Sequence, residues 1–255
     1  MLLSTTPLLN LSRPLSTSLS RFFITLLIAS VAVSAADLTV AAAADLIGAQ
    51  GDLTAGFQKV EGAPVRFSIG ASGILAKQIE NGAPFDVFLS ANEKFVRNLA
   101  AAGKVEPESV VVYATGRLGL WSRDGKIRDP KQLLDPAVKR VAIANPQFAP
   151  YGAAARELLQ KDGYWNAIEP KIIYAENVSQ TLQYAESGNV DAVITSWTLV
   201  HAKGGILLPQ DHGPIRQAGG VVAGAPQHEL ARKFLSFLQS ESGRAILARH
   251  GLTPP

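Results

Sequence analysis

The chain changes from a strand pattern to a helix pattern within Ser68-Ile69-Gly70-Ala71-Ser72-Gly73-Ile74-Leu75-Ala76-Lys77. Apolar and polar residues alternate just before this stretch, as in a half-buried strand, and apolar residues recur at helical spacing after it. Ser72 occupies the expected N-cap position, beside the first unpaired N–H groups of the helix. Because those groups and the helix dipole favour negative charge, the turn is suited to a small anion. The alternative is that Ser72 only caps its own helix.

Strand patterns alternate with helix patterns along the chain after residue 36. The alternation predicts an α/β fold with mainly parallel sheets. Four strand-to-helix turns carry small or polar residues at the helix start: Ala44-Asp45, Ser72-Gly73, Pro150-Tyr151-Gly152 and Asn177-Val178. In open α/β sheets ligands bind outside the carboxyl ends of the strands, where these turns lie. We therefore expect the four turns to enclose one anion with neutral donors.

Two segments of the chain repeat one pattern. Residues 78–90 and residues 184–195 each contain a helix end, a glycine and a buried strand. Glycine punctuation is common enough to produce such a likeness by chance, but we interpret it as two lobes of related architecture. The chain returns to a strand at residues 220–223, and two terminal helices then pack on the domain already begun. The predicted lobes are residues 36–114 with 209–255, and residues 115–208.

The first 35 residues have the features of a secretory signal peptide. Arg13 and Arg21 precede an apolar run over residues 22–33, and small residues follow, with cleavage expected after Ala35. A membrane anchor is the competing interpretation, but 12 apolar residues are too few to span a bilayer. The chain has no cysteine, so neither disulfides nor a lipid-anchoring cysteine are expected. These features predict a periplasmic protein.

Known catalytic and nucleic-acid-binding patterns are missing from the sequence. Removing residues 1–35 takes away two arginines and no acid, so 22 basic residues face 21 acidic ones, and this balance does not indicate nucleic acid. No histidine stands at metal-ligand spacing, and neither a Gly-x-Ser-x-Gly elbow nor a phosphate-binding loop is present. We therefore expect a binding protein without catalytic activity or cofactor. An α/β enzyme acting on a small anionic substrate is the alternative.

Four segments carry a resemblance to a known family. They are Val40-Ala41-Ala42-Ala43-Ala44-Asp45-Leu46, the run from Gly70 to Ala91, residues 144–152 and Glu176-Asn177-Val178. Their order and spacing resemble those of the periplasmic molybdate-binding proteins of ABC importers, over essentially the whole exported chain. The resemblance implies the two-lobed type II periplasmic binding protein fold, in which each lobe is a mainly parallel sheet flanked by helices. It also implies a tetrahedral oxyanion held in the cleft by serine hydroxyls and backbone N–H groups.

The resemblance also implies the site residues. Ser72 would give its hydroxyl and its N–H, and Tyr151 and Val178 would give backbone N–H groups. The remaining contact falls on Ala44 and Asp45, where family members often carry neutral polar residues. An ionised carboxylate about 4 Å from a unit negative charge costs on the order of 4 kcal/mol at an effective dielectric of 20. We therefore expect Asp45 to offer its backbone N–H, while its carboxyl group caps the first helix or is protonated.

Thr195 marks a second departure from the family pattern. Some relatives place a tyrosine here whose hydroxyl contacts the oxyanion, and Thr195 either replaces it with a shorter reach or only caps its strand. The expected ligand is molybdate, together with tungstate, and sulfate or phosphate is the alternative. The expected partner is an inner-membrane ABC permease that receives the oxyanion from a monomeric binding protein.

Overall fold

The computed structural model describes residues 37–255. The predicted signal peptide and its cleavage after Ala35 lie outside the described residues. Among residues 37–255, no helix combines the length and the apolar character needed to cross a membrane.

The first sheet contains five strands in the order β2-β1-β3-β10-β4. Their bounds are β1 (Leu38–Ala43), β2 (Val65–Gly70), β3 (Val87–Ser90), β4 (Val111–Gly116) and β10 (Ile215–Val221). The strands β2, β1 and β3 run parallel, whereas β10 is antiparallel to both of its neighbours. Strand β1 lies inside the sheet and is almost wholly buried, which explains its continuous apolar sequence.

The second sheet repeats this arrangement. Its strands are β5 (Leu118–Trp121), β6 (Val141–Ala144), β7 (Ile172–Ala175), β8 (Ala192–Ser196) and β9 (Ile206–Leu207). Their order is β7-β6-β8-β5-β9, with β7, β6 and β8 parallel and β5 antiparallel to both of its neighbours. The repeated sequence segments therefore take equivalent places, because one ends in β3 and the other in β8. The predicted α/β fold with two mainly parallel sheets is confirmed.

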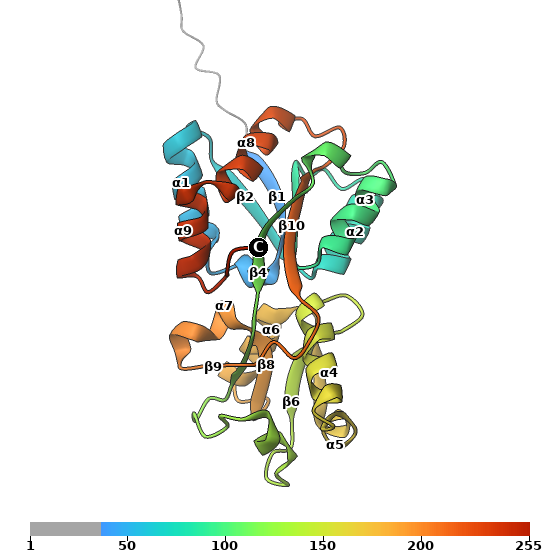
Figure 1. The fold of residues 1–255 in the computed structure, drawn as a ribbon, viewed down its shortest axis with the longest axis vertical. Coiled ribbons are helices and arrows are strands. Elements are labelled where there is room, and N and C mark those ends of the chain that lie inside the picture. Colours follow the sequence, from blue (N-terminus) through green and yellow to red (C-terminus); the bar gives the residue numbers. More distant parts are fainter. Residues whose placement is uncertain (1–36) are drawn as a thin grey trace, which may run out of the picture. The chain divides into compact units, whose positions relative to one another are not determined.

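Helices cover both faces of the first sheet (Figure 1). The helices α1 (Gln50–Glu61), α8 (His228–Gln239) and α9 (Glu241–Arg249) share one apolar core with this sheet, in which Phe57, Phe234 and Phe237 pack together. On the other face, α2 (Ser72–Glu80) and α3 (Glu93–Ala101) build a separate core.

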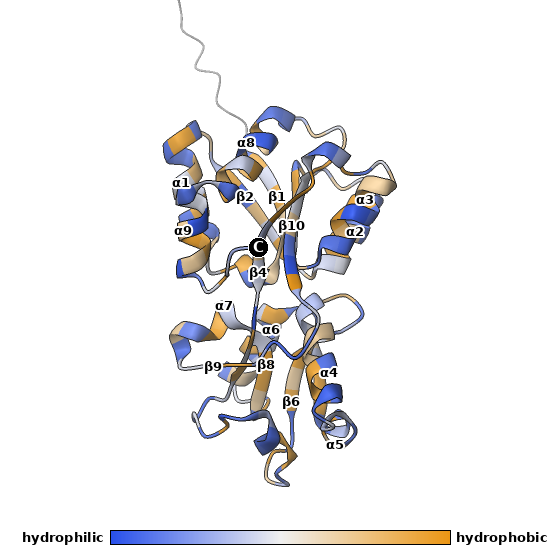
Figure 2. Cartoon of the chain, in the orientation of Figure 1, coloured by the Kyte–Doolittle hydropathy of each residue, from blue (hydrophilic) through white to orange (hydrophobic). Residues whose placement is uncertain are grey.

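The second sheet is covered by α4 (Pro150–Lys161), α5 (Trp165–Ile168), α6 (Val178–Glu186) and α7 (Trp197–Val200). Apolar residues concentrate on strands such as β6 and β8, while polar residues mark the helices (Figure 2). The short 3-10 turns are η1 (Ala44–Leu46), η2 (Pro107–Ser109), η3 (Pro130–Leu134), η4 (Glu169–Lys171) and η5 (His201–Lys203). The largest apolar core of the second sheet also includes Ala44, Ala71 and Ala91, which directly follow strands β1, β2 and β3 of the first sheet. The two sheets therefore pack together at these strand ends.

The chain passes between the sheets twice. It leaves the first sheet where β4 ends at Gly116, enters the second at Leu118, and returns between Leu207 and Ile215. The return strand was expected at residues 220–223, but β10 already begins at Ile215. The start of β10 was not predicted, because the buried Gln217 interrupts the apolar pattern from which strands are predicted. The lobe boundaries at residues 114/115 and 208/209 stay a prediction.

Candidate functional site

Four strand-to-helix turns meet around one small cavity. The turns follow β1, β2, β6 and β7, which are parallel strands of the two sheets. The cavity is lined by Ala43, Ala44, Asp45, Gly70, Ala71, Ser72, Ala91, Ala149, Pro150, Tyr151, Asn177 and Val178. The structure brings Ala44, Asp45, Ser72, Tyr151 and Val178 together at this cavity, and their contacts to an anion stay a prediction.

The cavity admits only a small ligand. Its volume, measured as the space open to the centre of a water-sized sphere, is about 10 Å³. This is roughly the volume that one water molecule needs. Its lining contains neither lysine nor arginine. The first turns of α2, α4 and α6 carry backbone N–H groups that have no acceptor within their helices, except at Pro150, which has no N–H. The cavity therefore offers hydrogen-bond donors to a small anion without a balancing cation.

Ser72 is held so that its hydroxyl hydrogen remains available. Its Oγ accepts a hydrogen bond from the backbone N–H of Ala91 at 3.0 Å, and the residue is 1% exposed. A hydroxyl group has one donor hydrogen, which this contact leaves free. The expected N-cap position is wrong: Ala71 is the N-cap in an extended conformation, and Ser72 is the first helical residue. Its side chain therefore does not cap the helix.

Asp45 is a buried residue of the cavity lining, and its hydrogen bonds connect the two sheets. Its Oδ2 accepts hydrogen bonds from Tyr151 Oη at 2.9 Å and from Gln217 Nε2 at 2.7 Å, while its Oδ1 has no partner among the described residues. Its backbone carbonyl accepts from Thr198 Oγ1 at 2.7 Å. Burial raises the pKa of Asp45 from 3.8 to about 7, against the opposing effect of the hydrogen bonds from Tyr151 and Gln217. The expected cap is wrong, since Ala43 is the N-cap of η1 and makes no side-chain cap contact.

Tyr151 contributes to the site with both its backbone and its side chain. Its N–H belongs to the first turn of α4, and its ring is buried. Gly116 makes room for the hydroxyl group, because a Cβ there would lie 2.2 Å from Tyr151 Oη. A side chain at the crossing between the sheets would thus displace the hydroxyl from Asp45.

The start of α6 is fixed from two directions. Asn177 Oδ1 accepts from the N–H groups of Ser179 and Gln180, both at 3.0 Å. Thr195 lies within β8 and donates from Oγ1 to the carbonyl of Val178 at 3.0 Å. Thr195 is therefore outside the cavity lining, one contact behind the predicted Val178 donor.

Comparison with known proteins places the chain in a family. Residues 38–253 match the family described as bacterial extracellular solute-binding protein. The chain belongs to this family. The solute-binding protein is 33% identical to the molybdate-binding protein ModA of Rhodobacter capsulatus over 223 residues, which cover 86% of this chain and 88% of the relative. It is 32% identical to ModA of Azotobacter vinelandii over 248 residues, covering 93% of this chain and 98% of the relative.

Solved structures agree with this fold. The periplasmic molybdate-binding protein of Azotobacter vinelandii superposes with a TM-score of 0.82 at 30% identity, covering 86% of this solute-binding protein and all of that chain. The sulfate-binding protein SubI of Mycobacterium tuberculosis reaches a TM-score of 0.72 at 20% identity, over 86% of each chain. This second likeness shows the fold alone. The two-lobed type II fold expected from the sequence is confirmed.

Sequence reasoning missed three residues beside the site of this solute-binding protein. Gln217 donates to Asp45, and Tyr113 Oη donates to Gln217 Oε1 at 3.2 Å. Phe148 accepts from the N–H of Gly73 at 2.8 Å. The available signal was Gln217 itself, a polar residue that follows the exposed Arg216 and precedes the apolar and glycine end of β10, where burial requires a hydrogen-bond partner.

Proposed function

We propose that this solute-binding protein captures molybdate, and also tungstate, in the cavity between its two sheets. The observation that carries the proposal is the small cavity at the starts of α2, α4 and α6, whose lining among the described residues contains neither lysine nor arginine. Its similarity to molybdate-binding proteins over most of the chain supports the same ligand. The protein binds its ligand without chemical turnover.

The proposed ligand contacts come from both sheets. Ser72 donates from its hydroxyl and its N–H, and Tyr151 and Val178 donate backbone N–H groups. Ala44 and Asp45 complete the set from the turn after β1. A buried dianion without a cation is stable only when nearly all of its oxygens receive hydrogen bonds. Thr195 supports this set indirectly, by holding the carbonyl of Val178.

Binding is coupled to closure of the two lobes, which we place at residues 36–114 with 209–255 and at residues 115–208. An oxyanion that contacts both lobes binds the closed form better and shifts the population toward it. The two crossings, at Gly116–Leu118 and between Leu207 and Ile215, are the segments about which the lobes move. The closed form then presents one composite surface to an inner-membrane ABC permease.

The proposed place of action is the periplasm, which the protein reaches as a monomer after removal of residues 1–35. Its molybdate-binding relatives include a periplasmic protein. The apolar run at residues 22–33, preceded by Arg13 and Arg21, supports export.

Thermal unfolding with a series of oxyanions tests the proposed function. A ligand present at 100 times its Kd stabilises the folded state by about 2.7 kcal/mol, which raises the unfolding temperature measurably. We expect molybdate and tungstate to raise it and equal concentrations of sulfate and phosphate to leave it nearly unchanged. Stabilisation by sulfate or phosphate but not by molybdate would overturn the proposed function.

A further inference from the structure

One carboxyl oxygen of Asp45, a residue of the cavity lining, has no hydrogen-bond partner among the described residues. Asp45 lines the cavity and is 2% exposed. Its Oδ2 is occupied by Tyr151 and Gln217, whereas its Oδ1 is buried without a hydrogen-bond partner among residues 37–255. Buried polar atoms are nearly always hydrogen-bonded, so an unpaired carboxyl oxygen on a residue of the cavity lining points to a bound group that completes it.

The groups that face this carboxyl group supply no positive charge. Tyr151 from α4, Gln217 from β10 and Tyr113 from β4 surround it, and Thr198 from α7 contacts the backbone carbonyl. Burial, and then the charge of Asp45, raise the pKa of each tyrosine well above 10, so both stay neutral. The starts of α2 and α6 add only neutral residues to the lining. Asp45 is thus the cavity group whose charge can change near neutral pH.

The environment of Asp45 already favours its neutral form. Burial is the main cause that raises its pKa from 3.8 to about 7. A dianion in the adjoining cavity acts in the same direction, because a like charge nearby disfavours ionisation of a buried carboxyl group. A carboxylate offers acceptors only, whereas a carboxylic acid also has one O–H donor. The ionised carboxyl group would repel the oxyanion, whereas in the neutral form the unpaired oxygen can carry the O–H that donates a hydrogen bond to it.

We propose that Asp45 takes up one proton when the oxyanion binds and donates a hydrogen bond from Oδ1 to an oxyanion oxygen. The proton comes from the solvent, an O–H bond forms at Oδ1, and no bond of the oxyanion changes. The proposal rests on the proposed function, because its ligand is the molybdate dianion. It assigns Asp45 a role that a backbone N–H cannot perform: the affinity for the oxyanion depends on pH.

Calorimetric titration with molybdate tests this proposal. At about pH 8.5, titrations in two buffers of different ionisation enthalpy should reveal uptake of about one proton per oxyanion. The affinity should fall from about pH 6 to about pH 9, with a slope approaching tenfold per pH unit.

Two variants separate the role of Asp45 from general effects of a buried carboxyl group. Asp45→Asn places a neutral amide donor at the same position, so proton uptake should disappear and the affinity should change less than about threefold over the same range. Asp86→Asn is the control, because Asp86 is 3% exposed but binds Thr39 and the N–H of Gln227 outside the cavity. This control should keep the pH dependence of the unmodified protein.

Each outcome distinguishes the two proposals. Molybdate binding without proton uptake at about pH 8.5 would overturn the role of Asp45 and leave the proposed function intact. Proton uptake that persists in Asp45→Asn would place the proton on another group and also overturn it. Absence of molybdate binding at every pH would instead overturn the proposed function itself.

Discussion

The backbone N–H of Gly73 donates to the carbonyl oxygen of Phe148 at 2.8 Å, and this contact joins the two sheets beside the cavity. Gly73 lies in the first turn of α2, whereas Phe148 precedes α4. A Cβ on Gly73 would lie 3.0 Å from the carbonyl oxygen of Phe148 and 3.1 Å from its Cα. An alanine at this position would therefore push the backbone of Phe148 away by a few tenths of an ångström.

Gly73→Ala should weaken molybdate binding by roughly tenfold, because the added methyl group holds the sheets apart while alanine favours the helix by about 1 kcal/mol. Titration calorimetry measures the affinity, and urea unfolding without ligand should show equal or greater stability. Gly51→Ala in α1 is the matched control, since its Cβ would meet nothing within 4 Å. Equal affinities in the two variants would show that this contact does not limit closure.

Ser72→Ala should reduce molybdate affinity by roughly 10- to 100-fold, because a hydrogen bond to a charged group contributes about 1.5–3 kcal/mol. The same change leaves the N–H of Ala91 unpaired and should cost about 1–3 kcal/mol of folding stability. Calorimetry and urea unfolding measure the two effects separately.

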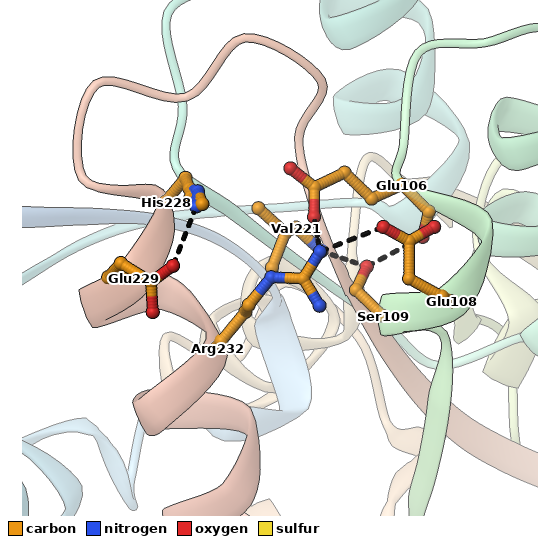
Figure 3. A network of polar contacts seen from close by, with 7 residues as sticks. All are labelled: Glu106, Glu108, Ser109, Val221, His228, Glu229 and Arg232. Carbon is orange, nitrogen blue, oxygen red and sulfur yellow. Dashed lines mark hydrogen bonds and ion pairs between the residues drawn. The ribbon is translucent and has the colours of Figure 1, made fainter.

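Ser109→Ala is the matched control for Ser72→Ala. Ser109 Oγ accepts from the N–H of Val221 at 2.8 Å, beside Arg232 and its partners Glu106 and Glu108 (Figure 3). Ser109 is also buried but does not line the cavity. The control should lose similar stability and keep its affinity. Similar losses of affinity in both variants would reduce Ser72 to a structural residue.

Asp45→Asn should stabilise the folded protein at high pH but not at low pH. The folded state keeps the proton between pH 3.8 and about 7, where the unfolded state has released it, so the contribution of Asp45 to stability falls as the pH rises through this window. At about 1.4 kcal/mol per pH unit, the gain of the variant over the unmodified protein reaches about 4 kcal/mol at pH 8. Urea unfolding from about pH 4 to about pH 8 measures it, and parallel curves for both proteins would contradict burial of an ionisable Asp45.

Thr195→Val should lower molybdate affinity by about threefold and stability by about 1 kcal/mol, because it removes the hydrogen bond that holds the carbonyl of Val178. Thr195→Ser keeps the hydroxyl group and should restore both quantities. Calorimetry and urea unfolding measure them. Failure of the serine variant to restore the affinity would show that the methyl group, and not the hydrogen bond, positions α6.

The sequence was sufficient to predict the alternation of strands and helices and the four turns at the site. Buried parallel strands carry continuous apolar runs, and helix starts carry small residues, so both signals are local. The repeated segments at residues 78–90 and 184–195 also predicted two related sheets. Each segment contains a helix end and a strand, β3 or β8, that takes the third place in its sheet.

Contacts between distant residues could not be predicted from local patterns. Asp45, Tyr151 and Gln217 are separated by 106 and 66 positions, and only the folded chain brings them together. Gln217 also broke the pattern of β10, because its polar side chain is buried among partners that no local rule identifies. The N-cap assignment of Ser72 was wrong by one residue, a usual uncertainty at helix ends.

A crystal structure of the protein with molybdate, phased on the anomalous signal of molybdenum, would show directly where the oxyanion binds. We expect one molybdate in the cavity between the starts of α2, α4 and α6, with oxygens within hydrogen-bond distance of Ser72, Tyr151 and Val178, and of Oδ1 of Asp45. An empty cavity with the oxyanion bound elsewhere, or an oxyanion held by lysine or arginine side chains, would contradict it.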